Sequence, residues 1–319
     1  MRAAPVLALV AVLATASLTA CSAGESAGDA PRGTSIVTTT TILGSITSDI
    51  AACADPEATV TTLMPIGTDP HDFAPSSQQV AQLVSADLVI TNGIGLEAGL
   101  TDSLDNAVSD GATVLAVGER LDPLPFGAHA DDQADHADEH GSEDPHVWFD
   151  MARMATAAEI IGDALAEGGN TAYAECGTQV ADGIRSAESG VRATLESVPA
   201  DRRILVTDHD ALGYLAEAYG YEIAGTVIPG GSTLAEPSSA DLASLVATIR
   251  TEDAPAIFAN TADSTTLADA VASEVGRPIE VVQLYVGSVG EPGSGAEDYI
   301  SMMQTDAALI ADALSPEAR

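Results

Sequence analysis

The feature that most constrains the fold is an alternation between strand-like and helix-like runs that occurs twice along the chain. β-branched runs such as Ser35–Thr39 and Ile204–Thr207 are each followed by an amphipathic stretch and then by another apolar run. Strands that alternate with helices in this order form a mostly parallel sheet covered on both faces. Between the two series, residues 171–198 keep helical spacing over a much longer stretch. The sequence therefore predicts an α/β fold of two lobes, each with a mostly parallel sheet flanked by helices, joined by one long helix.

The chain length supports two lobes. At 319 residues the chain exceeds the size of about 250–300 residues at which a single hydrophobic core usually stops growing. Expected strands cover residues 35–39, 58–64, 86–91, 113–117, 204–207, 222–228, 256–259 and 279–284. Expected helices cover residues 42–52, 77–85, 98–110, 151–167, 171–198, 210–219, 238–251, 264–275 and 297–314.

The charge balance excludes one class of partner. The chain has 11 basic residues against 48 acidic ones, which gives a formal net charge of −37, and no basic cluster interrupts the acidic surface. Such a surface repels phosphate backbones, so nucleic-acid binding is excluded. Aromatic residues make up only 3% of the chain, with Trp148 as the single tryptophan, which argues against a platform for stacking bases or sugars.

The N-terminus predicts export and a membrane anchor. Residues 1–20 contain Arg2 followed by an apolar run of signal-peptide length, too short to span a bilayer. The sequence Leu-Thr-Ala before Cys21 resembles the bacterial lipobox, in which that cysteine becomes the lipidated first residue. The alternative is an ordinary cleaved signal followed by a chance cysteine. Residues 21–34 are rich in Ser, Gly and Ala and predict a flexible tether. We therefore expect an extracytoplasmic protein, lipid-anchored to the membrane at Cys21.

Two cysteines remain once Cys21 is lipidated. The oxidising compartment permits a disulfide between Cys53 and Cys176, but the sequence cannot show whether their Cα atoms approach within about 7 Å. The two cysteines therefore either form a disulfide or remain two buried thiols, and the sequence does not decide between these states.

Three of the six histidines stand at comparable positions in the two lobes. His71 follows a strand, His146 precedes a helix, and His209 lies at a strand-to-helix junction. Each has an aspartate nearby in sequence, and a carboxylate can orient an imidazole that binds a metal. Neutral imidazole is the commonest ligand of transition metals, and three of them can hold Zn²⁺. From the residues alone, two interpretations are open. His71, His146 and His209 form one metal site, for which a cleft between the lobes is the natural place, or they are three separate surface or hydrogen-bonded histidines.

The other three histidines, His129, His136 and His140, share an acidic segment, residues 127–145. A segment rich in His, Asp and Glu without an apolar anchor cannot pack into a core, so we expect a disordered loop. It is either a plain acidic linker or a site of weak metal capture.

These motifs resemble those of a known family, the solute-binding lipoproteins of ABC-type zinc and manganese importers (ZnuA/TroA-like, cluster A-I). The resemblance lies in three stretches around the histidines: Pro65 to Phe73, Asp144 to Asp150, and His209 to Tyr214 with Ala218-Tyr219-Gly220. It also includes the lipobox, the acidic His-rich loop, the long central helix, and Tyr299 to Met303. The resemblance implies two lobes joined by a rigid helix, with the metal held between them.

The resemblance also bears on the choice of metal. Members that handle zinc usually have His at the third position, as His209 here, whereas members that handle manganese usually have a carboxylate. Three imidazoles suit Zn²⁺ better than the harder Mn²⁺. Many relatives supply a fourth ligand, an aspartate, where this chain has Gly287, and an acid often stands where this chain has Asn260. The fourth position is therefore water, Asp72 or Glu291.

The expected domain organisation follows these motifs. It comprises a signal peptide (1–20), a tether (21–34), an N-terminal α/β lobe (35–169, with the 127–145 loop), a linker helix (170–199) and a C-terminal α/β lobe (200–319).

The resemblance implies a monomeric receptor, not an enzyme, that captures Zn²⁺ and delivers it to a membrane permease driven by an ATPase. One alternative is a manganese or other divalent-metal receptor. Another is a zinc hydrolase that uses three His and a metal-bound water, with Asp208 or Asp210 as general base. A third is a surface adhesin of the same fold, since the family includes proteins linked to cell adhesion.

Overall fold

Two four-stranded parallel sheets form the framework. The computed structural model describes residues 33–127 and 143–315, and all elements below lie in those ranges. The N-terminal sheet has the order β2-β1-β3-β4, and the C-terminal sheet has the order β6-β5-β7-β8. The strands are β1 (Ser35–Thr38), β2 (Thr59–Thr62), β3 (Leu88–Thr91), β4 (Val114–Ala116), β5 (Ile204–Thr207), β6 (Glu222–Thr226), β7 (Ala256–Asn260) and β8 (Glu280–Leu284). Every pairing between these strands is parallel, and the two strand orders correspond, so the same connectivity occurs twice.

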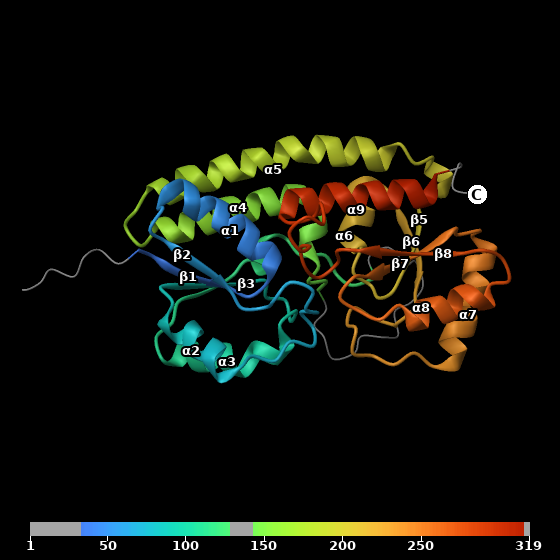
Figure 1. Cartoon of the computed structure of the whole chain (residues 1–319), viewed down its shortest axis with the longest axis horizontal. Helices are drawn as coiled ribbons and strands as arrows, with labels where there is room; N and C mark the ends of the chain where they lie inside the picture. The colour runs from blue at the N-terminus through green and yellow to red at the C-terminus, as the bar shows by residue number, and fades with distance from the viewer. Residues whose placement is uncertain (1–32, 128–142, 316–319) are drawn as a thin grey trace, which may run out of the picture. The chain divides into compact units, whose positions relative to one another are not determined.

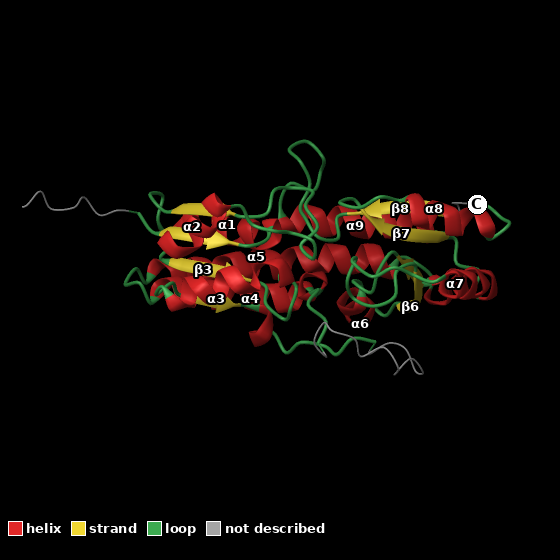
Figure 2. Ribbon diagram, turned by 90° about the horizontal axis from the view of Figure 1, so that it is seen from below, coloured by secondary structure: helices red, strands yellow, loops and turns green. Residues whose placement is uncertain are grey.

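Helices cover both faces of each sheet (Figure 1). In the N-terminal lobe, α1 (Thr41–Ala54) and α4 (Met151–Ala166) lie on one face, while α2 (Ser77–Ser85) and α3 (Thr101–Ser109) lie on the other. The view from below shows α2 and α3 in front of the N-terminal strands (Figure 2). In the C-terminal lobe, α6 (Gly213–Tyr219) and α9 (Tyr299–Leu314) face α7 (Ser239–Thr251) and α8 (Thr266–Glu274) across the sheet. Short 3₁₀ turns occupy Ala98–Leu100, Gly118–Arg120, Val147–Phe149 and Ala200–Arg202.

The long helix α5 (Ala172–Glu196) joins the lobes and packs against helices from both of them, α1 and α4 on one side and α9 on the other. Its contact with α4 is close because two glycines meet: a Cβ on Gly162 would lie 2.8 Å from the Cα of Gly177. The structure also joins Cys53 of α1 to Cys176 of α5 in a disulfide, with Cα atoms 5.9 Å apart. Of the two states that the sequence left open, the structure has the bonded one.

The core explains why the lobes belong together. Successive side chains of a strand point to opposite faces, so Ile36 packs beneath α1 and α4 while Val37 packs towards α2 and α3. The core that contains Ile36 continues without a break to Leu205 of β5 and to the helices α6 and α9. Consequently the residues from Gly33 onward form one compact unit rather than two separate ones.

The expected elements agree closely with the observed ones, and the main difference lies beside a candidate ligand. The expected helix 210–219 begins only at Gly213, because the three preceding residues continue the loop that follows β5. There the N–H of Asp210 donates to the carbonyl of Gly230 at 3.0 Å, and the N–H of Ala211 donates to the carbonyl of His209 at 2.9 Å, a tighter turn than that of a helix. Among the described residues, the structure has no helix that is long and apolar enough to cross a membrane.

Candidate metal centre

His71 lies in the loop between β2 and α2. The loop turns at Gly67, whose φ of +75° is a conformation that glycine adopts readily. Two residues before the histidine, the Asp69 carboxylate accepts a hydrogen bond from the His71 N–H at 3.0 Å. Asp69 also accepts from the hydroxyl of Thr233 in the C-terminal lobe. The aspartate thus fixes the backbone at His71 and ties this loop to the opposite lobe.

His146 stands immediately before the 3₁₀ turn that leads into α4. Its partner is again the aspartate two residues earlier: Asp144 Oδ1 accepts from the His146 N–H at 2.9 Å and from ring Nδ1 at 2.7 Å. A carboxylate oxygen can only accept, so the proton of the ring lies on Nδ1. This leaves the lone pair of Nε2 to face the centre of the site.

His209 lies two residues after the end of β5, and a neighbouring aspartate orients its ring, as Asp144 does for His146. Asp208 Oδ1 accepts from the His209 N–H at 2.7 Å and from ring Nδ1 at 2.8 Å. The second oxygen of Asp208 accepts from the Asn260 N–H at 2.6 Å, which anchors the aspartate to the end of β7. The sequence prediction that aspartates orient these histidines therefore has a geometric counterpart at both His146 and His209.

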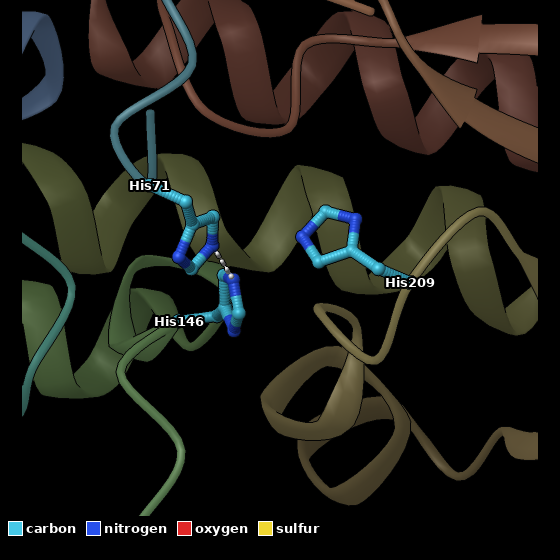
Figure 3. A group of neighbouring side chains, drawn as sticks. All are labelled: His71, His146 and His209. Carbon is cyan, nitrogen blue, oxygen red and sulfur yellow. Dashed lines mark hydrogen bonds between the residues drawn. The ribbon is translucent and has the colours of Figure 1, made fainter. Parts of the chain in front are cut away.

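The three rings converge on one point, as Figure 3 shows. The Nε2 atoms of His71 and His146 are 3.2 Å apart, and one ring nitrogen from each of the three residues lies within 4.8 Å of the others. Two nitrogen ligands of a tetrahedral zinc ion, at Zn–N distances of about 2.0–2.1 Å, lie about 3.3–3.4 Å apart. The spacing therefore fits a metal ion after small ring movements. The exposed fractions are 8% for His71 and 1% for His146 and His209, so a bound ion would be covered.

The surroundings shift the pKa values of His146 and His209 in opposite directions. Burial lowers the pKa of His146 well below its usual value, and the nearby His209 lowers it further. Burial also opposes the charged form of His209, but the charge and hydrogen bond of Asp208 outweigh it and raise the pKa of His209. Burial raises the pKa of Asp208, but its interactions with His209 and with the Asn260 N–H together outweigh burial and lower it. Asp208 and His209 thus each favour the charged form of the other.

Of the three candidates for the fourth position, the two carboxylates do not lie at the site, which leaves water. Asp72 and Glu291 are both exposed, and neither lines the site. The carboxylate that does line it is that of Asp69, which the sequence analysis missed. The repeated Asp-Pro-His triplet was an available signal, since Asp69 stands before His71 as Asp144 stands before His146. Among the described residues, however, no carboxylate joins the three rings as a ligand within the same 4.8 Å spacing.

Gly287 forms part of the wall of the site. A Cβ at this position would lie 2.7 Å from Cδ of Pro70, which is the residue beside His71. Pro70 therefore takes the space into which a side chain at position 287 would project. Asn260 also lines the site, and its amide donates to Asp263 at 2.8 Å.

The remaining expected residues divide into two groups. Cys21, His129, His136 and His140 lie outside the described residues. Asp208 and Asp210, the candidate bases of a hydrolase, are described. Asp208 is bonded to His209 and Asn260, and Asp210 does not line the site.

Comparison with known proteins identifies the family. The model of the ZnuA family, described as the periplasmic component A of a zinc-uptake complex, matches residues 36–313. The chain is 29% identical to the manganese-binding lipoprotein MntA of Halalkalibacterium halodurans, over 89% of each chain. It is also 29% identical to the zinc-binding protein TroA of Treponema pallidum, over 95% of this chain and 97% of the relative. The solved structure of the periplasmic zinc-binding protein TroA superposes with a TM-score of 0.77 at 27% identity, and the match covers 89% of this chain and 99% of that one.

Proposed function

We propose zinc as the cargo of this chain, which belongs to the ZnuA family and is a metal-binding, substrate-binding protein of an ABC transporter. The observation that carries the proposal is the convergence of three buried imidazoles, from His71, His146 and His209, on one point. Three nitrogen ligands with a fourth position left for water form a typical zinc coordination set.

Manganese is the second candidate, because relatives of similar identity are named for zinc and for manganese. Manganese is a harder ion that favours carboxylate and water oxygens. Among the described residues, none of the carboxylates joins the three rings within ligand spacing. Pro70 also occupies the space that an acid at position 287 would need. Both observations favour zinc.

Delivery is the second part of the proposal. A receptor of this kind passes its ion to a permease in the membrane, which an ATPase drives. The lipobox at Cys21 would keep the receptor beside that permease, outside the cytoplasm, and we propose that it acts there as a monomer. The hydrolase alternative gains no support, because a bound ion would be covered and Asp208, one candidate base, is already bonded to His209.

Zinc affinity should fall as the pH falls. Binding requires neutral imidazoles, and protons compete for the same nitrogens. Because Asp208 raises the pKa of His209, its protonated form persists above the ordinary histidine value of about 6.5. Weakening should therefore begin above pH 6.5, with proton release on binding. Competition against a chelator of known affinity between pH 8 and pH 5.5 measures this. An affinity that stays constant over that range would contradict it.

Replacing Asp208 by asparagine should weaken zinc binding by about 10- to 100-fold, the usual cost of losing a residue that orients a metal ligand. The substitution removes the charge that holds His209 Nδ1–H and that raises the pKa of His209. The pH at which binding weakens should therefore also move down. Asp210→Asn is the matched control, since it removes a nearby carboxylate that does not line the site. Equal effects of the two substitutions would contradict the role of Asp208.

A further inference from the structure

The segment Tyr285–Val289, between β8 and α9, supplies none of the three ring ligands and yet holds both N-terminal ligand loops. The indole N–H of Trp148, two residues after His146, donates to the carbonyl of Val286 at 2.8 Å. The N–H of Gly67, four residues before His71, donates to the hydroxyl of Ser288 at 2.9 Å. This C-terminal segment therefore connects the loops of His71 and His146 to the lobe that carries His209.

The connection is completed by two buried hydroxyls from opposite lobes. The hydroxyl of Thr41, in the first turn of α1, donates to the hydroxyl of Ser288 at 3.2 Å and accepts from the Val289 N–H at 3.0 Å. Ser288 in turn donates to the carbonyl of Val289 at 2.8 Å. The exposed fractions of Thr41 and Ser288 are 7% and 2%. Each of the two hydroxyls both donates and accepts a hydrogen bond, so neither is left unsatisfied in the buried cluster.

We propose that Thr41 and Ser288 form a latch between the lobes that sets how long the bound metal is retained. They are positioning residues: neither lies among the ring ligands, and they act by holding the loop of His71 against the C-terminal lobe. This inference rests on the proposed function, because it concerns the release of the same ion.

The latch should act on release because the site must open for the ion to leave. A metal between rings that are 1–8% exposed has no direct route to solvent. Separation of the lobes at this point breaks the bonds of Ser288 to Thr41 and to Gly67. A substitution that removes one hydroxyl lowers the free-energy barrier to opening by the contribution of one buried hydrogen bond. This corresponds to roughly tenfold faster release of the ion.

The fluorescence of Trp148 can report the release of the ion. Trp148 is the only tryptophan, its ring centroid lies 5.2 Å from that of His146, and its N–H is bonded to the segment beside the latch. Its fluorescence should therefore change when the ion leaves. The experiment loads the full chain with Zn²⁺, mixes it with excess chelator in a stopped-flow instrument and records the rate of that change.

Four variants make the measurement specific. Thr41→Val keeps the shape and removes the hydroxyl, whereas Thr41→Ser keeps the hydroxyl. Ser288→Ala removes its partner. Thr62→Val is the matched control, because it breaks a hydroxyl pair of similar length, 3.1 Å to Thr38, that lies within the N-terminal sheet. A loss of general stability would affect both hydroxyl pairs, whereas the latch predicts a difference between them.

We expect release to become roughly tenfold faster in Thr41→Val and in Ser288→Ala, and to remain near the wild-type rate in Thr41→Ser and Thr62→Val. Release from the double variant, Thr41→Val with Ser288→Ala, should be slower than the product of the two single accelerations predicts. Both substitutions break the same hydrogen bond, so their effects do not add. Unchanged release in Thr41→Val and Ser288→Ala, or equal acceleration in Thr62→Val, would overturn the latch while leaving the zinc receptor intact. A wild-type chain that retained no Zn²⁺ would overturn both proposals.

Discussion

Replacing His209 by alanine should weaken zinc binding by at least about 100-fold. The free energy of a structural zinc site is about 10–16 kcal/mol, so the share of one position in four is about 2.5–4 kcal/mol. His209 is also the only one of the three proposed ligands that comes from the C-terminal lobe, after β5. Its loss therefore removes both a ligand and the metal's direct bond to that lobe.

Titration of the metal-free chain with Zn²⁺ in competition with a chromophoric chelator measures this loss. His136→Ala is the matched comparison, since it also deletes an imidazole, but from the 127–145 segment. The His136→Ala variant should still bind one Zn²⁺ per chain as tightly as the wild type does. If both variants bound Zn²⁺ as the wild type does, His209 would not be a ligand and the three-histidine site would be wrong.

Removing the disulfide should have the largest effect on stability. The bond between Cys53 and Cys176 closes a loop across 123 positions of sequence. A loop of that length loses enough freedom in the unfolded chain to stabilise the fold by about 4–5 kcal/mol in the chain-entropy account. Replacing both cysteines by serine should therefore lower the free energy of unfolding by about that amount.

Urea unfolding of the metal-free chain tests this, because a bound metal would add its own stabilisation. The wild-type chain in reductant should unfold at the same urea concentration as the double variant. Zinc affinity should change little, since the disulfide joins α1 to α5 and neither cysteine lines the metal site. Equal unfolding midpoints for the oxidised wild type and the double variant would contradict the prediction.

Much of the fold follows from local patterns. The β-branched run at Ser35–Thr38 and the helical spacing of Ala172–Glu196 specify their elements almost to the residue. Alternation of strand and helix then requires parallel pairing, and parallel strands carry their following loops to one edge. His71 and His209 could therefore each be placed at that edge of their own sheet, but the expectation that the two edges face each other came from the resemblance to the family.

Other features depend on contacts that no local pattern encodes. Asp69 and Asp72 are three positions apart in one loop, but only Asp69 lines the site, and the turn geometry that decides this is not evident in the sequence. Thr41 and Ser288 are separated by 247 positions, and their bond depends on how the first turn of α1 packs against the segment after β8. The pairing of Cys53 with Cys176 likewise depends on the packing of α1 against α5.

The most direct test of the central claim is the binding of Zn²⁺ and Mn²⁺, each titrated separately into the metal-free chain. Displacement of Mn²⁺ by Zn²⁺ would not suffice, because most sites with nitrogen or oxygen ligands prefer zinc over manganese. The affinity for Mn²⁺ alone is therefore the informative quantity. Three imidazoles with no carboxylate ligand predict tight one-to-one binding of Zn²⁺ and weak binding of Mn²⁺. Tight one-to-one binding of Mn²⁺, or no tight binding of Zn²⁺, would contradict the account.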